Sequence, residues 1–344
     1  MARIKYVDGF RGFALLSMVF MHVYDALAKT SIYTDAPFFI KAINTPLFNP
    51  PALFTIVSGM SVYLAVTHLL KNNTKSETAK KTAITYIKYI MLSLPFTIFM
   101  WGLPTYLEWN EAIQGIGLSA LITALIIIYL KPRNYELILS IILLTLARGY
   151  ILESQPLSNI FPYNTDLTNP LITLGSTVLN ALYRGWFSVM NLVPLMLSGI
   201  IFYKATRKHS VKKLLILSAL LTIISIYLHF NGLSIDYYSK SINFTLYAIG
   251  SCGIIFSIIK WVYDKREISF LTKAGMHSLG IYISHHLLIL KPIWIYWRDT
   301  LPEINAFLIA IPLTWLAYMI VKHVKITIKP NATILKEKNI PQAS

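Results

Sequence analysis

Two histidines within apolar stretches are the side chains of this sequence best suited to chemistry. The first, His22, is followed three residues later by Asp25, so the two lie one turn apart on one face of a helix. A carboxylate beside an imidazole orients the ring and favours proton uptake, as general-base catalysis requires. We therefore expect His22, oriented by Asp25, to act as a base. The alternative is a histidine that only hydrogen-bonds a neighbouring helix.

The second histidine is His285, which shares a helix face with Ser278 and Tyr282 at spacings of four and three residues. It is either part of the same chemistry or a core or pore-lining histidine. Its neighbour His286 is expected to point elsewhere. No histidines have the local spacing typical of metal ligands, and the lone Cys252 lies in an apolar run, so the sequence predicts no bound metal.

Charged groups inside apolar helices need an explanation, because each costs about 2.5–3.5 kcal/mol to insert into a membrane. Asp8 and Arg11 continue the helix face of His22, with Arg11 about 16 Å from His22 along the axis. One interpretation of the two charges is an ion pair that anchors the helix. Other polar groups fall mostly in the outer half of their helices and suggest a polar cavity that opens outward. They are Gln114, Arg148, Arg184, Asn191 and Asn243.

The elements that position these residues are membrane-spanning helices. Of the 344 residues, 55% are apolar and only 13% are charged, about half the usual soluble share of roughly 25%. The apolar residues form runs of about 20, long enough to cross a ~30 Å hydrocarbon core. The fold class is therefore an all-α helical bundle with ten spans, expected at 9–28, 50–70, 84–104, 112–130, 135–152, 186–204, 212–230, 241–262, 275–294 and 303–322.

Basic residues indicate the orientation of this bundle. With the N-terminus inside, the inner segments hold 23 of the 31 Lys and Arg and the outer segments seven; the last is Arg11. The net charge of +16 thus reflects a positive inner side rather than nucleic-acid binding. We predict a multi-pass cell-membrane protein with both termini in the cytoplasm, a single domain over 1–325 and a polar tail over 326–344. The apolar stretch 170–183 is short for a crossing and is expected to be a half-helix or interfacial helix.

Four sequence blocks resemble the transmembrane acyltransferase superfamily, and most closely the heparan-alpha-glucosaminide N-acetyltransferase catalytic-domain family with its prokaryotic relatives. The opening resembles the family's Arg, Asp-x-x-Arg-Gly-x-Ala, Met and His pattern. The later blocks resemble Phe-x-x-x-Ser-Gly, Leu-Gln-x-Ile-Gly and Gly-x-x-Ser-Leu-x-x-Tyr-x-x-His. In this chain the blocks run over Arg3–Asp25, Leu53–Ser61, Ala112–Leu118 and Gly275–His285.

The resemblance implies an integral membrane acyltransferase that uses acyl-CoA, most simply acetyl-CoA, as co-substrate and holds no permanent cofactor. The acceptor would be a hydroxyl or amine of an extracytoplasmic or membrane-embedded molecule, such as a sugar or a lipid-linked sugar. His22, Asp25 and His285 would be catalytic. Donor phosphates would bind near Arg3, Lys5, Asp8 and Arg11, and the acceptor near Gln114, Arg148, Ser278 and Tyr282.

One departure concerns the outer loop 29–49, which contains no histidine, although the heparan enzyme has an important one there. His22 or His285 would have to replace it, and the acceptor need not be glucosamine. The rival function is a secondary transporter or lipid flippase that uses the same histidines as proton-relay groups. The missing internal repeat and the four blocks argue against it. A homodimer is compatible with either function.

Overall fold

A computed structural model describes residues 4–29, 50–154, 169–208, 210–233, 235 and 241–324. Arg3, most of the outer loop 29–49 and the tail 326–344 lie outside this part of the chain. Within it, ten helical stretches are long and apolar enough to span a membrane, which confirms the predicted bundle. The one strand-like contact recorded there is a parallel bridge between Ala28 and Leu301.

The helical elements follow one another through the described residues with short connections. They are α1 (Lys5–Leu27), α3 (Pro50–Leu69), α4 (Lys75–Trp101), α5 (Leu103–Leu107), α6 (Ala112–Leu125), η1 (Ile126–Leu130), α7 (Asn134–Ser154), α8 (Pro170–Leu179), η2 (Asn180–Arg184), α9 (Val189–Lys208), α10 (Val211–Phe230), α11 (Ile242–Lys265), α12 (Ser269–Met276), α13 (Ser278–His285), η3 (His286–Leu290), α14 (Lys291–Tyr296) and α15 (Glu303–Val324). The three elements written η are single π-helical turns. Such turns are rare in proteins, and those that occur are often found at functional sites.

Two predicted spans differ from the structure at their first residues. Helix α4 begins at Lys75 rather than at residue 84, because Thr74 and Glu77 form a capping box that starts the helix within a charged segment. The span expected at 275–294 is interrupted: α12 ends at Met276, and α13 begins at Ser278. The crossing element is the stretch Ser278–Tyr296.

The stretch predicted as a half-helix forms α8 and η2. These elements have ten and five residues, about 22 Å of helix, which is shorter than the ~30 Å hydrocarbon core. Asn169 caps the start of α8 by accepting from the amides of Leu171 and Ile172. A short break follows η2, and α9 then completes the apolar stretch Pro170–Arg207.

Burial separates central from peripheral helices. In the apolar windows of α1 and α11, 61% and 72% of the residues are buried, against 17% in that of α7 and 22% in that of α10. The peripheral helices expose large apolar side chains such as Leu143 and Ile223, as expected for surfaces that face lipid tails. Helix α1 therefore lies inside the bundle.

A close helix crossing fixes the position of α1 against α12. A Cβ added to Gly12 would lie 2.0 Å from the Leu271 carbonyl oxygen, and one added to Gly275 would lie 1.9 Å from that of Asp8. Only glycine permits this approach of two backbones, and close packing through small residues is a common way to join membrane helices. This crossing of α1 and α12 places α13, which follows α12, beside the C-terminal half of α1.

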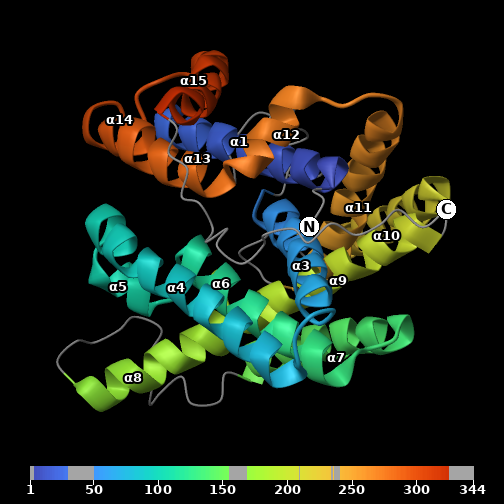
Figure 1. Ribbon diagram of the computed structural model, residues 1–344. Coiled ribbons are helices and arrows are strands. Elements are labelled where there is room, and N and C mark those ends of the chain that lie inside the picture. The colour runs from blue at the N-terminus through green and yellow to red at the C-terminus, as the bar shows by residue number, and fades with distance from the viewer. Residues whose placement is uncertain are drawn as a thin grey trace.

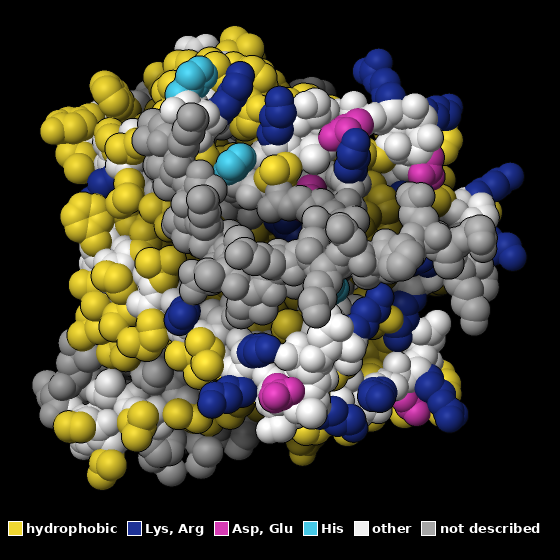
Figure 2. Space-filling model, viewed as in Figure 1, with side chains coloured by type: hydrophobic (Ala, Val, Ile, Leu, Met, Phe, Trp, Pro, Cys, Tyr) yellow, Lys and Arg dark blue, Asp and Glu magenta, His cyan; other side chains and the backbone are white. Residues whose placement is uncertain are grey.

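Figure 1 shows α1 surrounded by α12, α13 and α15 on one side of the molecule, with α4, α6 and α8 on the other. The charged side chains are not spread evenly over the surface. In Figure 2, Lys and Arg gather in the centre and toward the right of the view, whereas hydrophobic side chains cover much of the left. This distribution matches a bundle with one basic end.

Candidate active site

Three histidines meet between α1 and the junction of α13 with η3. Nδ1 of His22 lies 3.3 Å from Nε2 of His285. The ring of His22 also stacks on His285 at a centroid distance of 5.5 Å and meets His286 edge to face at 5.3 Å. His285 and His286 are buried, and His22 is half-buried. The structure thus joins two residues that are 263 positions apart, as their predicted common role requires.

The prediction that His286 points elsewhere is wrong. Consecutive residues of an α-helix diverge by about 100°, which was the basis of that prediction. The ring of His22 lies between the two divergent side chains and contacts both of them. The π-helical turn η3 begins at His286, so the helix departs from regular geometry at this point.

The backbone of α13 determines which ring nitrogens carry protons. Nδ1 of His285 lies 3.0 Å from the Ile281 carbonyl oxygen, and Nδ1 of His286 lies 2.9 Å from that of Tyr282. A carbonyl oxygen only accepts, so both Nδ1 atoms donate, and in the neutral rings both Nε2 atoms keep a lone pair. Nε2 of His285 therefore accepts from Nδ1 of His22, which leaves the lone pair of His22 on Nε2.

A buried carboxylate that the sequence analysis missed lies next to this cluster. The Tyr282 hydroxyl donates to Oε1 of Glu111 over 2.6 Å, and Glu111 is only 3% exposed. The ring of Tyr282 packs against His286 at 4.6 Å. Glu111 precedes the predicted span 112–130 by one residue, where an acidic side chain is normally solvated, but it lies three residues before Gln114 in the third sequence block.

Aromatic side chains at the end of α4 close the cluster on another side. Phe96 meets both Tyr282 and His286, and Trp101 meets His286 edge to face at 6.2 Å. Nζ of Lys291 donates to the carbonyl oxygen of Met100 and so fixes α14 to the same helix end. These rings limit the access of water to the buried imidazoles.

Beyond Glu111, two segments bury polar groups without a protein partner. The amides of Trp186 and Phe187 donate to Asn110 and to the carbonyl oxygen of Trp109, so the loop after η2 docks on the start of α6. Within the described residues, buried side-chain atoms of both segments lack any hydrogen bond, and we call this set the polar patch. It consists of Nε1 of Trp109, both amide atoms of Gln114, Oγ of Ser188 and Oδ1 of Asn191.

An unpaired buried polar group costs about 1–3 kcal/mol, so such groups are rare unless a ligand or water satisfies them. Gln114 is fully buried, which makes its two unpaired atoms the strongest such signal in the patch. The placement agrees with the prediction that Gln114 binds substrate, a prediction that no direct observation tests.

The other predicted site residues take different places. Asp25 lies half-buried on α1, but the recorded partner of His22 Nδ1 is His285. Ser278 begins α13, two turns from His285. Arg148 is buried on α7, which packs against α9 and contacts η2, and Figure 1 shows α7 and α13 on opposite sides of the bundle. Arg148 is therefore not part of the histidine cluster.

The N-terminal end of α1 is held by ion pairs. Arg11 donates to Asp8 at 2.8 Å and to Oγ of Ser61 at 2.5 Å, which confirms that the two charges form a pair. Lys5 pairs with Glu267 at 2.6 Å, and this contact lowers the pKa of the Glu267 carboxyl. The predicted roles of Lys5, Asp8 and Arg11 in binding phosphates stay predictions.

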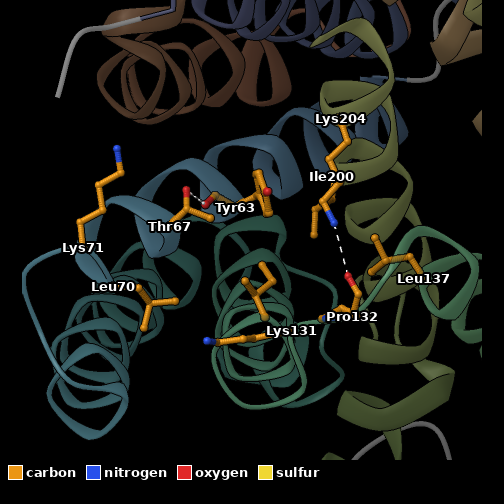
Figure 3. A pocket seen from close by; sticks show the side chains of 10 residues that line it. Tyr63, Thr67, Leu70, Lys71, Lys131, Pro132, Leu137, Ile200 and Lys204 are labelled. Carbon is orange, nitrogen blue, oxygen red and sulfur yellow. Dashed lines mark hydrogen bonds between the residues drawn. The ribbon is translucent and has the colours of Figure 1, made fainter. Parts of the chain in front are cut away.

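A basic pocket lies at the ends of α3, η1 and α9. It has a volume of about 360 Å³ and is lined by Tyr63, Lys71, Lys131 and Lys204 among others. Figure 3 shows the three lysines on different segments with their amines pointing in different directions, that of Lys204 toward the carbonyl oxygen of Pro132. Lys131 has a φ of 46°, in the left-handed region, at the turn between η1 and α7. The pocket combines positive charge with an apolar lining.

The described part of the chain thus places imidazoles, a buried carboxylate and buried polar groups without a protein partner between helices long enough to span a membrane, and ionisable groups in such a position mark a functional site. The comparison with known families identifies the class of the protein. Residues 3–239 match the model of the heparan-alpha-glucosaminide N-acetyltransferase catalytic family, and the chain belongs to this family. The predicted family is thereby confirmed.

The matched range includes α1, α3 and α6, and so His22, Glu111 and Gln114. It ends before α11, so α13 and η3, which carry His285 and His286, lie beyond it. The family is one of transferases, so the chain is read as a multi-pass membrane acetyltransferase rather than as a transporter. No curated protein matches the chain in a sequence search.

Proposed function

We propose that this protein transfers an acetyl group from cytoplasmic acetyl-CoA to a hydroxyl or amine of an acceptor, a sugar or lipid-linked sugar, at the outer side of a cell membrane. The observation that carries the proposal is the pair of His22 and His285, which Tyr282 and Glu111 connect to the segment with the unpaired polar groups. The family supplies the reaction type. The pair supplies a group that can accept a proton within the membrane.

His22 is the proposed general base, and its reactive atom is Nε2. Its Nδ1–H donates to His285, whose own Nδ1–H donates to the Ile281 carbonyl oxygen, and this chain fixes both rings. His285 therefore takes the orienting role that the sequence suggested for Asp25. When Nε2 takes a proton, the resulting imidazolium keeps its acceptor at Nδ1, which stabilises the charged form.

The proposed reaction needs only this one base. Nε2 of His22 removes the proton of the acceptor hydroxyl or amine as the oxygen or nitrogen attacks the thioester carbonyl carbon. The carbon–sulfur bond then breaks, and the CoA thiolate takes the proton from the His22 imidazolium. The ring returns to its neutral form, and the products are the acetylated acceptor and free CoA.

The polar patch is the proposed acceptor site. A sugar presents several hydroxyl groups, each of which both donates and accepts. The patch offers acceptors at Gln114 and Asn191 and donors at Trp109 and Gln114, all buried and free of protein partners among the described residues. The proposed role of Glu111 is to accept hydrogen bonds from further hydroxyl groups of the acceptor. It lies one turn before Gln114, and the Tyr282 hydroxyl holds one of its oxygens.

The basic pocket is the proposed site of the donor's phosphates. Lys71, Lys131 and Lys204 all line this pocket, and rotation of their side chains would bring the three amines toward one anionic group, whereas Arg11 is already held by Asp8 and Ser61. Apolar and aromatic lining from Leu70 and Tyr63 suits a nucleotide base. The pantetheine arm would then run from the inner end of the bundle toward His22.

The direct test measures binding and turnover of radiolabelled acetyl-CoA by the purified protein. We expect saturable binding, slow hydrolysis without acceptor, and transfer of label to added sugars or lipid-linked sugars. His22→Ala should keep donor binding and lose turnover, and His323→Gln, which changes an exposed histidine at the end of α15, is the matched control. A transporter or flippase would show neither acetyl-CoA binding nor hydrolysis.

The proposed orientation places both termini in the cytoplasm. Reporter fusions after residues 75, 208 and 340 should then read cytoplasmic, and those after residues 160 and 235 should read external. A cytoplasmic reading at residue 160 would overturn the orientation and, with it, the assignment of the basic pocket to a cytoplasmic donor.

A further inference from the structure

The three histidines also have the arrangement of a metal site. One ring nitrogen from each of His22, His285 and His286 lies within 4.8 Å of one from each of the others. We infer that these imidazoles bind a Zn²⁺ ion with three protein ligands. The expectation of no metal site considered spacing within single helices, and this set combines α1 with the α13–η3 junction.

The closest pair already has the separation that zinc requires. Two nitrogens bound to tetrahedral Zn²⁺ at 2.0–2.1 Å are about 3.3–3.4 Å apart. Nδ1 of His22 and Nε2 of His285 are 3.3 Å apart. Two neutral imidazoles at this distance share one hydrogen, and an ion that replaces this hydrogen keeps the separation of the two nitrogens. The third nitrogen, from His286, lies within 4.8 Å of both.

The outer partners of two ligands are also those of a zinc site. Histidine ligands almost always donate their second ring N–H to a carboxylate, a backbone carbonyl or water, which fixes the ring and strengthens the ligand. His285 and His286 donate Nδ1–H to the carbonyl oxygens of Ile281 and Tyr282. Their Nε2 lone pairs are therefore set for a metal before any metal arrives.

The choice of zinc follows from the donor atoms. An all-imidazole set suits zinc and its neighbours in the first transition series, whereas Mg²⁺ and Ca²⁺ need oxygen ligands. Three histidines leave the fourth tetrahedral position open for water or another small ligand. The buried ring of Phe96 and the half-buried ring of Trp101 beside His286 restrict exchange with solvent and favour slow release of the ion.

Bound zinc has a consequence that rests on the proposed function. Coordination through Nδ1 of His22 requires the ring to carry its proton on Nε2, the atom proposed to accept the proton of the acceptor. A neutral imidazole has one lone pair, which zinc needs on Nδ1 of His22 and the acceptor proton needs on Nε2. Bound zinc and proton transfer therefore exclude one another at this ring. The site becomes an inhibitory zinc site, at which Zn²⁺ stops acetyl transfer and a chelator restores it.

Metal binding is tested on the full chain without a polyhistidine tag, purified in detergent. After equilibrium dialysis against Zn²⁺, metal analysis should find one ion per chain. Co²⁺ in place of Zn²⁺ should give the intense visible absorption of a tetrahedral site. His285→Gln and His286→Gln should each weaken zinc binding by at least about tenfold, while His323→Gln should bind as the unchanged protein does.

The results separate this inference from the proposed function. If the unchanged protein binds no zinc, or if both glutamine variants bind it as well as His323→Gln does, the zinc site is overturned even when acetyl transfer is observed. If zinc binds as expected but the protein neither binds nor hydrolyses acetyl-CoA, the site stands and the proposed function fails. Where transfer is measurable, zinc that binds without inhibiting it would overturn the inhibitory role.

Discussion

The two ends of α1 hold polar groups in opposite ways. At the N-terminal end, Asp8 and Arg11 neutralise one another, and Ser61 bonds a further guanidinium nitrogen. At the C-terminal end, His22 contacts the rings of His285 and His286, whose Nδ1 atoms donate to backbone carbonyls. The first group pairs opposite full charges, whereas the second leaves lone pairs on ring nitrogens.

The difference separates support from chemistry on one helix. A paired charge holds its partner in place and has little capacity left for a reaction. A neutral imidazole whose tautomer is fixed can still take a proton or a metal ion. The comparison therefore predicts that changes to Asp8 or Arg11 reduce the stability of the fold. Changes to His22 should reduce activity in a protein that stays folded.

The largest effect is expected for His22→Ala. Loss of the base should lower kcat by about two to four orders of magnitude, the usual contribution of general-base catalysis. The measurement is acetyl transfer at saturating acetyl-CoA, with donor binding and thermal unfolding as controls for folding. Turnover near that of the unchanged protein would place the base elsewhere, and a dead His285→Ala variant beside it would reverse the two roles.

At the other end of the helix, Arg11→Ala should act on stability. It leaves Asp8 as a buried carboxylate without its ion pair, which costs about 3 kcal/mol. Thermal unfolding in detergent would record the loss. Exchanging the two residues, Asp8→Arg with Arg11→Asp, should recover part of it, and recovered folding without recovered acetyl-CoA binding would give Arg11 a donor role after all.

A smaller effect is expected in the polar patch. Gln114→Leu removes two unpaired buried polar atoms, so the protein should fold at least as stably as before. The KM for the acceptor should rise about tenfold, as the loss of one or two hydrogen bonds implies. Ser119→Ala on the same helix is a matched control, because it also removes a buried, unpaired hydroxyl. Equal acceptor KM in both variants would remove Gln114 from the acceptor site.

The smallest effect is expected for Asp25→Asn. The bond from Nδ1 of His22 goes to His285, and asparagine keeps the size and one acceptor oxygen of the aspartate, so activity should fall by about fivefold or less. Kinetic measurement beside His285→Asn makes the comparison direct. A loss at Asp25 that exceeds the loss at His285 would restore the carboxylate as the orienting group.

Hydropathy was sufficient to predict the bundle, because each span is a local run of apolar residues. The meeting of His22 and His285 could be predicted for a similar reason, since each lies on a polar helix face, while their common role stays a prediction. The bond from Tyr282 to Glu111 could not be predicted, because Glu111 lies outside the predicted spans and on no polar helix face. The contact of His286 with His22 was also missed, since it depends on where one ring sits between two diverging side chains.

Glu111 illustrates a second limit. A carboxylate just outside an apolar run is normally solvated at the membrane surface, so hydropathy assigns it no role. Its burial results from the loop after η2, which covers the start of α6. The composition of neither segment indicates that the two meet. A signal was available only in its position one turn before Gln114, in a block that resembles the family.

The π-helical turn η3 amounts to a single inserted residue in the helix that crosses the membrane after His277. Without it, every residue from Lys291 onward would be rotated by about 100° relative to α13. Upstream of the insertion, the helix presents histidines to α1; downstream, Lys291 bonds the end of α4, and Trp294 meets Trp101. One extra residue thus allows the helix to contact α1 through His285 and the end of α4 through Lys291 and Trp294. Deleting one residue between 287 and 290 would rotate the two halves relative to each other, so that one of these two sets of contacts is lost.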